Sequence, residues 1–378
     1  MTEKRQYHVI IGSKSYFDTA IANVDMKNSA GFLELVRLWD NAKQVKDLDK
    51  SIFDKIKTPS LIIKNDNYHG IVDAAHDRLG GLIEDLTTAE AEIYVHNPPQ
   101  RLSSYLSDQY RRQIIELDIQ KEEYSIKRDP EHFSTNISDI RRSIIGQDNA
   151  VDEISKSLWY LTTVERSKPY VIMLYGNSSL GKTELVREVA AKFFEGKFLE
   201  KHLSMFKNNN YSDYFFGDAP NRRSLGFDLL ERESNLVFFD EIDKCPEYFY
   251  SAFYTLFDNI LFKDATYDVD VSGAIIILTS NYQTEDEMKS NLGLPVYYRI
   301  DKFIHFSDFS SDVIYRIVMK ELEERQDEYK DKLTVDDIYR VVSSRLNCTG
   351  ENARTIKYKI QQVIEDLLFE EVIECQQQ

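Results

Sequence analysis

The chain has 378 residues, which is too long for one small domain and suits two or three domains that each bury a core. Hydrophobic residues make up 42% and charged residues 29%, as in ordinary globular proteins, and no apolar run approaches the roughly 20 residues of a membrane helix. The formal net charge of −17 would repel phosphate backbones, which disfavours general nucleic-acid binding and favours a protein partner.

The first 125 residues predict a small α/β domain. Short apolar or β-branched runs predict strands at 7–11, 60–64 and 91–96, and helical patterns lie between them at about 30–42 and 70–86. No hydrolase, nuclease or protease motif is visible in this part of the chain. We therefore expect this domain to dock a protein partner.

Polar residues of this first domain give no clear ligand site. His69, His76 and His96 lack metal-ligand spacing, which favours packing or surface roles. The turn at Gly12 and Ser13 follows the first strand and could contact a phosphate, but a single glycine is too little to predict a phosphate site.

Two features bear on the location of the protein. The cysteines, Cys245, Cys348 and Cys375, are far apart and have no metal-ligand spacing. The first residues, MTEKRQYHVI, contain no apolar stretch of signal-peptide length. Both features lead us to expect a reduced, cytoplasmic protein.

The pattern changes after the first domain. Residues 101–133 are charged and weakly periodic, and Pro130 interrupts any helix before it, so we predict a linker at 126–142. Residues 143–308 then alternate turns and helices with apolar runs of buried-strand length, which predicts a parallel sheet between helices. The runs are PYVIMLYG, KHLSMF, NLVFFDE, GAIIILTS and DKFIHF. Residues 309–378 predict a helical subdomain, with helices at 311–327, 335–346 and 351–375.

The segment GNSSLGKT lies between the apolar run VIMLY and the helical pattern ELVREVAAKFF. In a phosphate-binding loop of this form, glycines let successive backbone N–H groups point at phosphate oxygens, and the following helix adds its positive end. We expect Lys182 to reach the β- and γ-phosphates and the Thr183 hydroxyl to bind Mg²⁺. The nucleotide-binding residues predicted here are Gly176, Asn177, Ser178, Ser179, Leu180, Gly181, Lys182 and Thr183.

Phosphoryl transfer also needs carboxylates, and LVFFDEID supplies them about 60 positions after this loop. Asp240 ends an apolar strand, which suits a role in holding Mg²⁺. Glu241 follows at once and suits activation of the attacking water. The two segments together predict a site for ATP and Mg²⁺.

Taken together, these residues resemble the AAA+ ATPases, and within them the branch of Clp-type protein unfoldases and torsins. The resemblance covers about residues 144–374. It implies a P-loop αβα sandwich with a helical lid. IIGQDNAV looks like the family's N-terminal box, in which Ile145 would contact adenine. TSN would make Asn281 the first sensor, and NARTIKYKI would make Arg354 the second sensor on the lid.

The resemblance also concerns assembly. YYRIDKFIHF resembles the arginine-finger segment, which would place Arg299 at the γ-phosphate of a neighbouring subunit. A cation supplied in trans stabilises the transition state only in an assembled ring or helical stack. We therefore expect an ATP-dependent homo-oligomer whose isolated subunits hydrolyse ATP poorly.

The sequence departs from the unfoldase pattern in the segment between the second strand and the carboxylates. The aromatic-glycine loop that grips a polypeptide is absent from FFGDAPNRRSLGFDLLERES, where Phe215, Phe216 and Phe227 are more readily explained as core or helix residues than as gripping residues. Ser179 replaces a glycine that close relatives carry, at a position that does not define the loop.

Two functions therefore remain open. The protein either remodels or disassembles a protein partner using ATP, or acts as a nucleotide-controlled oligomeric switch without threading. A motor directed at DNA is disfavoured by the acidic charge, although Arg222 and Arg223 could form a local contact.

Overall fold

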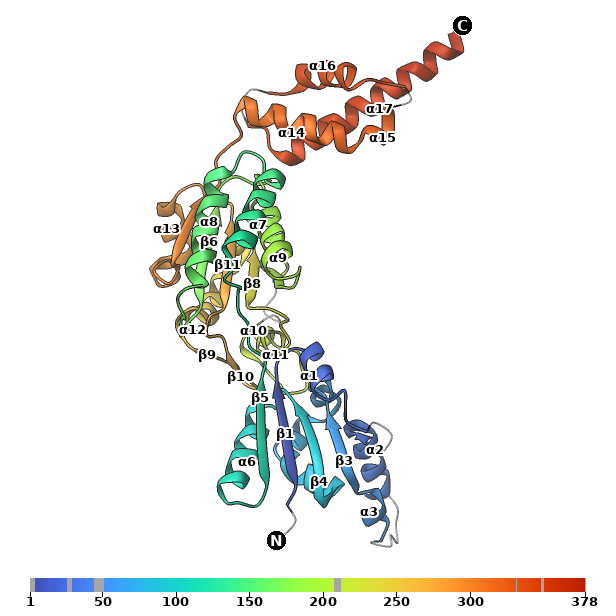
Figure 1. Ribbon diagram of the computed structural model, residues 1–378, viewed down its shortest axis with the longest axis vertical. Helices are drawn as coiled ribbons and strands as arrows, with labels where there is room; N and C mark the ends of the chain where they lie inside the picture. The colour runs from blue at the N-terminus through green and yellow to red at the C-terminus, as the bar shows by residue number, and fades with distance from the viewer. Residues whose placement is uncertain are drawn as a thin grey trace.

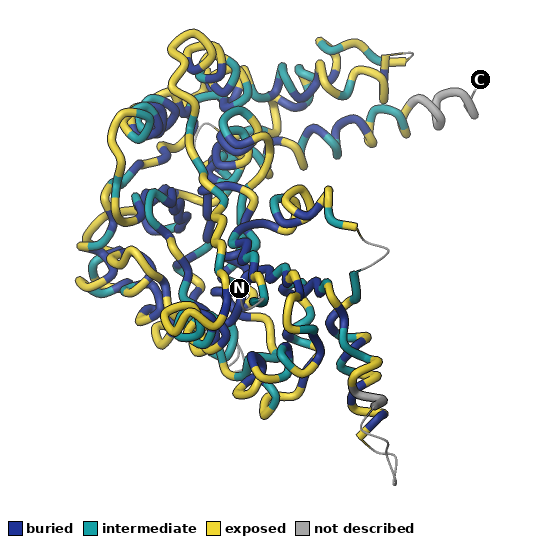
Figure 2. The backbone as a smooth tube through the Cα atoms, turned by 60° about the horizontal axis from the view of Figure 1, so that its bottom comes forward, coloured by how far each residue is buried: buried dark blue, intermediate teal, exposed yellow. Residues whose placement is uncertain are grey.

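The computed structural model describes residues 4–25, 29–43, 51–206, 212–330, 332–347 and 350–377. Two α/β units and a helical lid follow one another along the long axis of the molecule (Figure 1). Buried residues gather inside the two α/β units, and the lid helices carry exposed residues along their outer sides (Figure 2). The α/β fold with a P-loop sandwich is confirmed.

The first unit is built on a five-stranded parallel sheet with the order β2-β3-β4-β1-β5. Alternate residues of its strands face opposite sides, so Tyr7 and Val9 join the main core of this unit while Ile10 joins a smaller cluster under α1. Its elements are β1 (Gln6–Ile11), α1 (Lys14–Ala20), β2 (Ala30–Gly31), α2 (Phe32–Lys43), α3 (Ser51–Ile56), β3 (Thr58–Ile63), η1 (Asn65–Gly70), α4 (Asp73–His76), α5 (Leu79–Leu86), β4 (Thr87–His96), α6 (Gln100–Arg111) and β5 (Glu116–Lys121).

Sequence patterns missed several elements of this unit, among them β5 and α1. β5 lies at the edge of the sheet and is exposed at most positions, so its sequence ELDIQK lacks the apolar run that marks a buried strand. α1 is only seven residues long and buries Phe17 alone, which leaves no helical period to detect. The stretch predicted as one helix at 70–86 consists of the separate helices α4 and α5.

The predicted linker at 126–142 differs from the structure. Residues Pro130–Ser143 form the helix α7, with Asp129 accepting hydrogen bonds from the first turn and Pro130 as the first helical residue. Proline fits this position because its missing N–H would have no partner there. Phe133 and Ile140 of α7 are buried in the core of the second unit, so this helix belongs to that unit's packing.

The second unit is a three-layer sandwich around a parallel sheet with the order β12-β6-β11-β8-β7. Alternate residues of β6 join a core with α7, α8 and α9 on one face and a core with α11, α12 and α13 on the other. Its further elements are α8 (Asp148–Leu161), β6 (Tyr170–Tyr175), α9 (Lys182–Phe193), β7 (Leu199–His202), η2 (Leu203–Met205), α10 (Ser212–Phe216), α11 (Leu225–Leu230), β8 (Leu236–Asp240), η4 (Ile242–Lys244), η5 (Glu247–Phe249), α12 (Tyr250–Asp258), β9 (Leu261–Lys263), β10 (Asp268–Asp270), β11 (Ile275–Ser280), α13 (Glu285–Tyr297) and β12 (Lys302–His305).

The lid consists of α14 (Ser311–Glu324), α15 (Gln326–Tyr329), α16 (Val335–Arg345) and α17 (Ala353–Gln377). α17 packs against α14 and α16 and then extends away from the molecule (Figure 1). Buried residues of the lid, such as Val313 and Ile360, are continuous with the core of the second unit. Within the described residues, none of the helices is long and apolar enough to cross a membrane.

Candidate nucleotide-binding site

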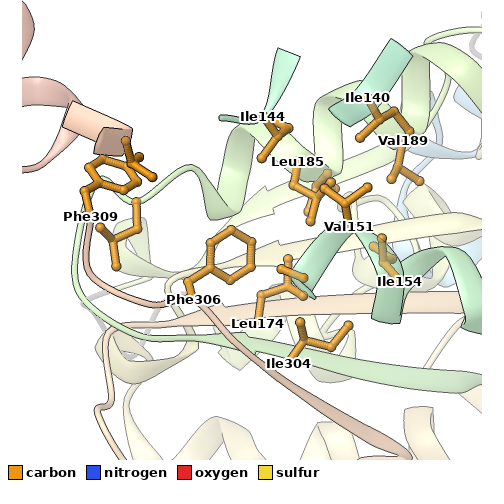
Figure 3. Close-up of a cluster of buried hydrophobic side chains, with 14 of the residues drawn as sticks. Ile140, Ile144, Val151, Ile154, Leu174, Leu185, Val189, Ile304, Phe306 and Phe309 are labelled. Atoms are coloured by element: carbon orange, nitrogen blue, oxygen red, sulfur yellow. The ribbon is translucent and has the colours of Figure 1, made fainter. Parts of the chain in front are cut away.

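The predicted nucleotide-binding residues gather at the carboxyl ends of β6, β8 and β11, on the side of the second sheet that faces the lid. Open parallel sheets bind ligands at the carboxyl ends of their strands, at the point where the strand order reverses. Beneath the site, Leu174 on β6, Leu185 on α9 and Phe306 after β12 belong to one buried apolar cluster (Figure 3). This packing gives the loop between β6 and α9 a rigid base.

The loop after β6 turns through backbone conformations with positive φ. Gly176 has a φ of 132°, and a Cβ at this position would lie 2.4 Å from the backbone oxygen of Phe306. Gly181 has a φ of 98° and directly precedes the first helical residue of α9. Ser179 also has a positive φ, of 60°, which a glycine would adopt without strain. The departure at Ser179 is therefore accommodated in a conformation that favours glycine.

Lys182, the first residue of α9, points back into this loop. Its Nζ donates hydrogen bonds to the backbone oxygens of Gly176 and Asn177, both at 2.7 Å, and lies 3.3 Å from Oδ1 of Asn281. The side chain is buried, with only 7% of the residue exposed. Burial lowers the pKa of Lys182 to about 8, against the opposing influence of the nearby Asp243, Asp240 and Glu241 carboxylates.

The Asp240 carboxylate is held by three side chains from neighbouring elements. Its Oδ1 lies 3.3 Å from the Thr183 hydroxyl and accepts a short hydrogen bond from the Thr279 hydroxyl. Its Oδ2 lies 3.2 Å from Nδ1 of His202, which ends β7. Thr183 in the first turn of α9 and Asp240 at the end of β8 present neighbouring oxygen ligands, which is the chemistry that Mg²⁺ prefers.

Glu241 adopts a left-handed conformation, with φ 60° and ψ 52°, directly after β8. Its backbone N–H donates to the Thr279 hydroxyl at 2.9 Å, so one hydroxyl contacts both adjacent acidic residues. Such a conformation costs free energy in a non-glycine residue and persists where surrounding contacts hold it. Thr279 is therefore a structural support of both predicted carboxylates.

Asn281 joins the loop to a third carboxylate. Its Oδ1 faces the Lys182 ammonium, and its Nδ2 lies 3.3 Å from Oδ2 of Asp243. The sequence resemblance predicted Asn281 as the first sensor. The described contacts of the Asn281 side chain are with Lys182 and Asp243, and its role as a sensor stays a prediction.

The N-terminal box and the lid meet at the same edge. A Cβ at Gly146, which has a φ of 81°, would lie 2.3 Å from a methyl group of Val313 on α14. Ile145 is partly buried against the adjoining core. On the other side, the backbone N–H of Ala353 at the start of α17 donates to the Ser179 oxygen at 3.1 Å. The exposed Arg354 is the next residue, so the predicted second sensor stands beside the loop.

The remaining loop residues have different environments. Asn177 donates through Nδ2 to the Asp308 carboxylate at 2.7 Å, which ties the loop to the segment leading into the lid. Ser178 is exposed, whereas Leu180 is buried in the core beneath the loop. Leu180 thus serves packing, and its contribution to nucleotide binding is limited to its backbone.

Arg299 lies outside this cluster. Its Nε is 2.6 Å from Oδ2 of Asp258, its Nη1 donates to the Pro295 oxygen at 2.6 Å, and its guanidinium lies 5.0 Å from the centre of the Tyr254 ring. The side chain is 29% exposed. These contacts are on α12 and α13, so the structure does not bring Arg299 to the nucleotide-binding loop of its own chain.

The residues present fit ATP with Mg²⁺. Among the residues that the structure describes, no group of three or more His, Cys, Asp or Glu side chains is arranged to hold a metal ion by itself. Mg²⁺ is usually held by one or two protein oxygens together with substrate phosphates, which matches Thr183 and Asp240. The Lys182 ammonium and the amino end of α9 supply the positive charge that phosphates require.

Comparison with known proteins agrees with this geometry. A family model described as "AAA domain (Cdc48 subfamily)" matches residues 167–335. Residues 167–335 are therefore similar to an AAA domain, as the sequence resemblance predicted. It is 25% identical over 268 residues to "Chaperone protein ClpB" of Tropheryma whipplei, covering 62% of this chain and 38% of that protein.

Two further relatives give the range of the similarity. "Mitochondrial disaggregase" of Homo sapiens is 26% identical over 163 residues, covering 39% of this chain and 22% of that protein. "Chaperone protein ClpC, chloroplastic" of Pisum sativum is 24% identical over 421 aligned positions, covering 94% of this chain and 44% of that protein. The chain spans less than half the length of these relatives. None of the three names is a torsin, so the torsin side of the resemblance gains no support from them.

Sequence reasoning missed three residues that contact the predicted site. Asp243 lies in the same LVFFDEID segment and Thr279 in the TSN segment. Their positions near the ends of predicted strands could have indicated that both residues contact the site. His202 carried none, because nothing in KHLSMF indicates that the end of β7 meets the end of β8. Its contact with Asp240 depends on the pairing of these two strands.

We predict that Thr279→Val slows ATP hydrolysis by about tenfold while ATP binding stays within about twofold. The substitution removes the hydroxyl that bonds the Glu241 N–H and the Asp240 carboxylate, and one such bond contributes about 1 kcal/mol. Steady-state turnover and nucleotide titration measure the two effects. Ser280→Ala is the matched control, because the neighbouring buried Ser280 hydroxyl has no hydrogen-bond partner among the described residues. Equal turnover in the two variants would show that Thr279 has no supporting role.

We predict that Arg299→Ala leaves ATP binding nearly unchanged and lowers hydrolysis about a thousandfold, the usual effect of removing an arginine finger. Arg166→Ala is the matched control, since Arg166 also pairs with an aspartate, Asp301, and lies over a tyrosine ring, that of Tyr170. Turnover and nucleotide titration are measured on both variants. Unchanged turnover in Arg299→Ala would eliminate the finger assignment.

Proposed function

We propose that this protein binds and hydrolyses ATP as a homo-oligomer and uses the cycle to remodel or disassemble a protein partner. The observation that carries the proposal is the convergence of Lys182, Thr183, Asp240 and Glu241 at one sheet edge under the lid. The relatives named as chaperones and disaggregases support remodelling as the use of this site.

We assign the following roles to the residues of the site. Lys182 and the loop N–H groups bind the phosphates, and Thr183 and Asp240 hold Mg²⁺, which when bound neutralises charge on the phosphates. Glu241 is proposed to orient the attacking water with the help of Asn281. Ile145 and Arg354 would contact the nucleotide from the N-terminal box and the lid.

Assembly follows from the position of Arg299. Because its contacts lie on α12 and α13, away from the loop of its own chain, it would serve the site of a neighbouring subunit in a ring or helical stack. The ion pair with Asp258 holds it in the absence of a neighbour. A cytoplasmic location remains our prediction from the sequence.

A nucleotide-controlled switch without threading is the second candidate, and one observation favours it. Phe215 and Phe227 are only 1% and 2% exposed, so neither is available to grip a polypeptide, and Phe216 is 40% exposed. The Phe227 ring also lies 4.7 Å from the His69 ring of the first unit. The aromatic side chains of this segment therefore serve mainly the core.

Contact with nucleic acid gains no support from the two arginines of this segment. Arg222 pairs with Asp213 and Asp218, and Arg223 pairs with the buried Asp228. Their charges are thus balanced within the chain. A protein partner remains the better match to the net charge of −17.

We predict that Glu241→Gln binds ATP, loses at least about a hundredfold in hydrolysis and accumulates as a larger assembly when ATP is added. The amide keeps the size of the side chain but cannot accept a proton from water. Size-exclusion chromatography with light scattering gives the mass with and without ATP, and the exposed Glu247→Gln is the control. A variant that binds ATP yet stays monomeric would contradict the assembly model.

Phe216→Ala distinguishes the two candidate functions. If the protein is a switch, ATP turnover with and without fluorescently labelled casein, an unfolded probe protein, should match the unmodified chain within about twofold. Loss of casein-stimulated turnover with basal turnover intact would favour gripping. Phe227→Ala is the control that shows how damage to the core alone changes turnover, because truncating a buried phenylalanine destabilises a protein by about 3 to 5 kcal/mol.

A further inference from the structure

The two sheets of this chain have the same topology. When the strands of each sheet are numbered in chain order, both sheets read fifth, first, fourth, third, second, and every pairing is parallel. The first strand of the second sheet, β6, leads into the nucleotide-binding loop. The turn after β1 occupies the same place in the first sheet, and both sheets direct their carboxyl ends along the same axis of the molecule (Figure 1).

Equivalent positions in the first sheet lack the means to bind a nucleotide. Two residues, Gly12 and Ser13, separate β1 from α1, whereas residues 176–181 separate β6 from α9. Such a short turn cannot wrap a chain of phosphates. β3 ends at Ile63 and is followed by Lys64, at the place where β8 ends at Asp240 and is followed by Glu241. The end of β3 therefore has no carboxylates at the two positions that, after β8, are predicted to hold Mg²⁺ and to activate water.

Side chains of the first unit already fill this turn. The Glu122 carboxylate accepts a hydrogen bond from the Ser13 N–H at 2.6 Å, and a Cβ on Gly12 would lie 2.5 Å from the Cβ of Glu122. Asn97 accepts from the Gly12 N–H at 3.0 Å, and both Asn97 and His96 contact the Gly12 oxygen. The backbone groups that would face a phosphate are thus satisfied within the chain.

The second unit covers the same edge. Oε1 of Glu231, just after α11, accepts from Asn65 Nδ2 at 2.7 Å and from Asn97 Nδ2 at 3.4 Å, and lies 3.7 Å from Nδ1 of His96. The Tyr124 hydroxyl, just after β5, lies 2.7 Å from the Arg232 oxygen. A carboxylate of the second unit therefore stands at the strand ends where a ligand of the first sheet would bind.

The β9–β10 hairpin adds a second set of contacts to this edge. The Gln100 N–H donates to the Thr266 oxygen at 2.8 Å, and the Tyr267 hydroxyl lies 3.4 Å from Oδ1 of Asn65. The Tyr267 side chain is fully buried. The contact between the units is thus polar at Glu231 and Tyr267 and includes the packing of the Phe227 ring against the His69 ring.

We propose that residues 6–121 form a second copy of the P-loop sheet topology that does not bind nucleotide, and that its carboxyl edge docks the AAA domain of the same chain through Glu231 and the β9–β10 hairpin. Each chain then binds one nucleotide, at the second sheet only. The docked edge also contacts α11. This helix lies in the segment between the second and third strands of the AAA domain sheet.

Nucleotide stoichiometry tests the first half of this proposal. Titration of the full chain with MgATP in a calorimeter should give one site, and Lys182→Ala should remove all binding. Two sites, or one site retained in Lys182→Ala, would overturn the assignment of the first sheet. Complete absence of binding by the unmodified chain would contradict the proposed ATPase function, and the docking measurement then decides the present inference by itself.

Hydrogen exchange tests the docking. Glu231→Ala removes the acceptor for Asn65 and Asn97, so the amides of 65–70 and 225–230 should exchange about tenfold faster than in the unmodified chain. Glu233→Ala is the matched control, because Glu233 is exposed two positions later. Retained MgATP binding in Glu231→Ala shows that the AAA domain is folded. Unchanged exchange in Glu231→Ala, or equal acceleration in both variants, would overturn the docking surface.

Discussion

A buried ammonium group organises the nucleotide-binding edge of this molecule. Lys182 is enclosed by the backbone oxygens of its own loop and by Asn281, so the charge is compensated without a full ion pair. The same arrangement fixes the path of the loop, because its carbonyl groups must turn inward towards Nζ. The positive φ values at Gly176 and Gly181 accompany this inward turn. A phosphate that binds here would offer the ammonium a stronger partner than the carbonyl groups do.

The carboxylates of the site depend on hydroxyl groups from a neighbouring strand and a neighbouring helix. Thr279 on β11 and Thr183 on α9 both contact Asp240 on β8, so the register of the parallel sheet determines how the acidic groups point. Arg299 shows the opposite arrangement, because its contacts are confined to α12 and α13. Within one chain, these contacts keep the Arg299 guanidinium away from the acidic groups at the ends of β8 and β11.

The sequence predicted the second unit better than the first for a physical reason. Strands buried on both faces, such as β8, are continuous apolar runs, and GNSSLGKT has a fixed relation to the strand before it and the helix after it. The exposed edge strand β5 gives no comparable pattern, and α7 begins with a proline that reads as a break. Contacts such as that of His202 with Asp240 arise from strand pairing, which a linear pattern does not reveal.

The common direction of the two sheets determines which edge of the molecule a ligand can reach. The carboxyl edge of the first sheet is closed by Glu231 and Tyr267, which belong to a rigid unit with its own core. The carboxyl edge of the second sheet is closed by the lid, which joins that sheet through the short segment 306–310. Opening the first edge requires two folded units to separate, whereas opening the second requires the lid to turn about this segment and its buried residues to shift within the core that they share with the second unit. The order of the units along the chain therefore puts a separately folded unit at the first carboxyl edge and the lid at the second.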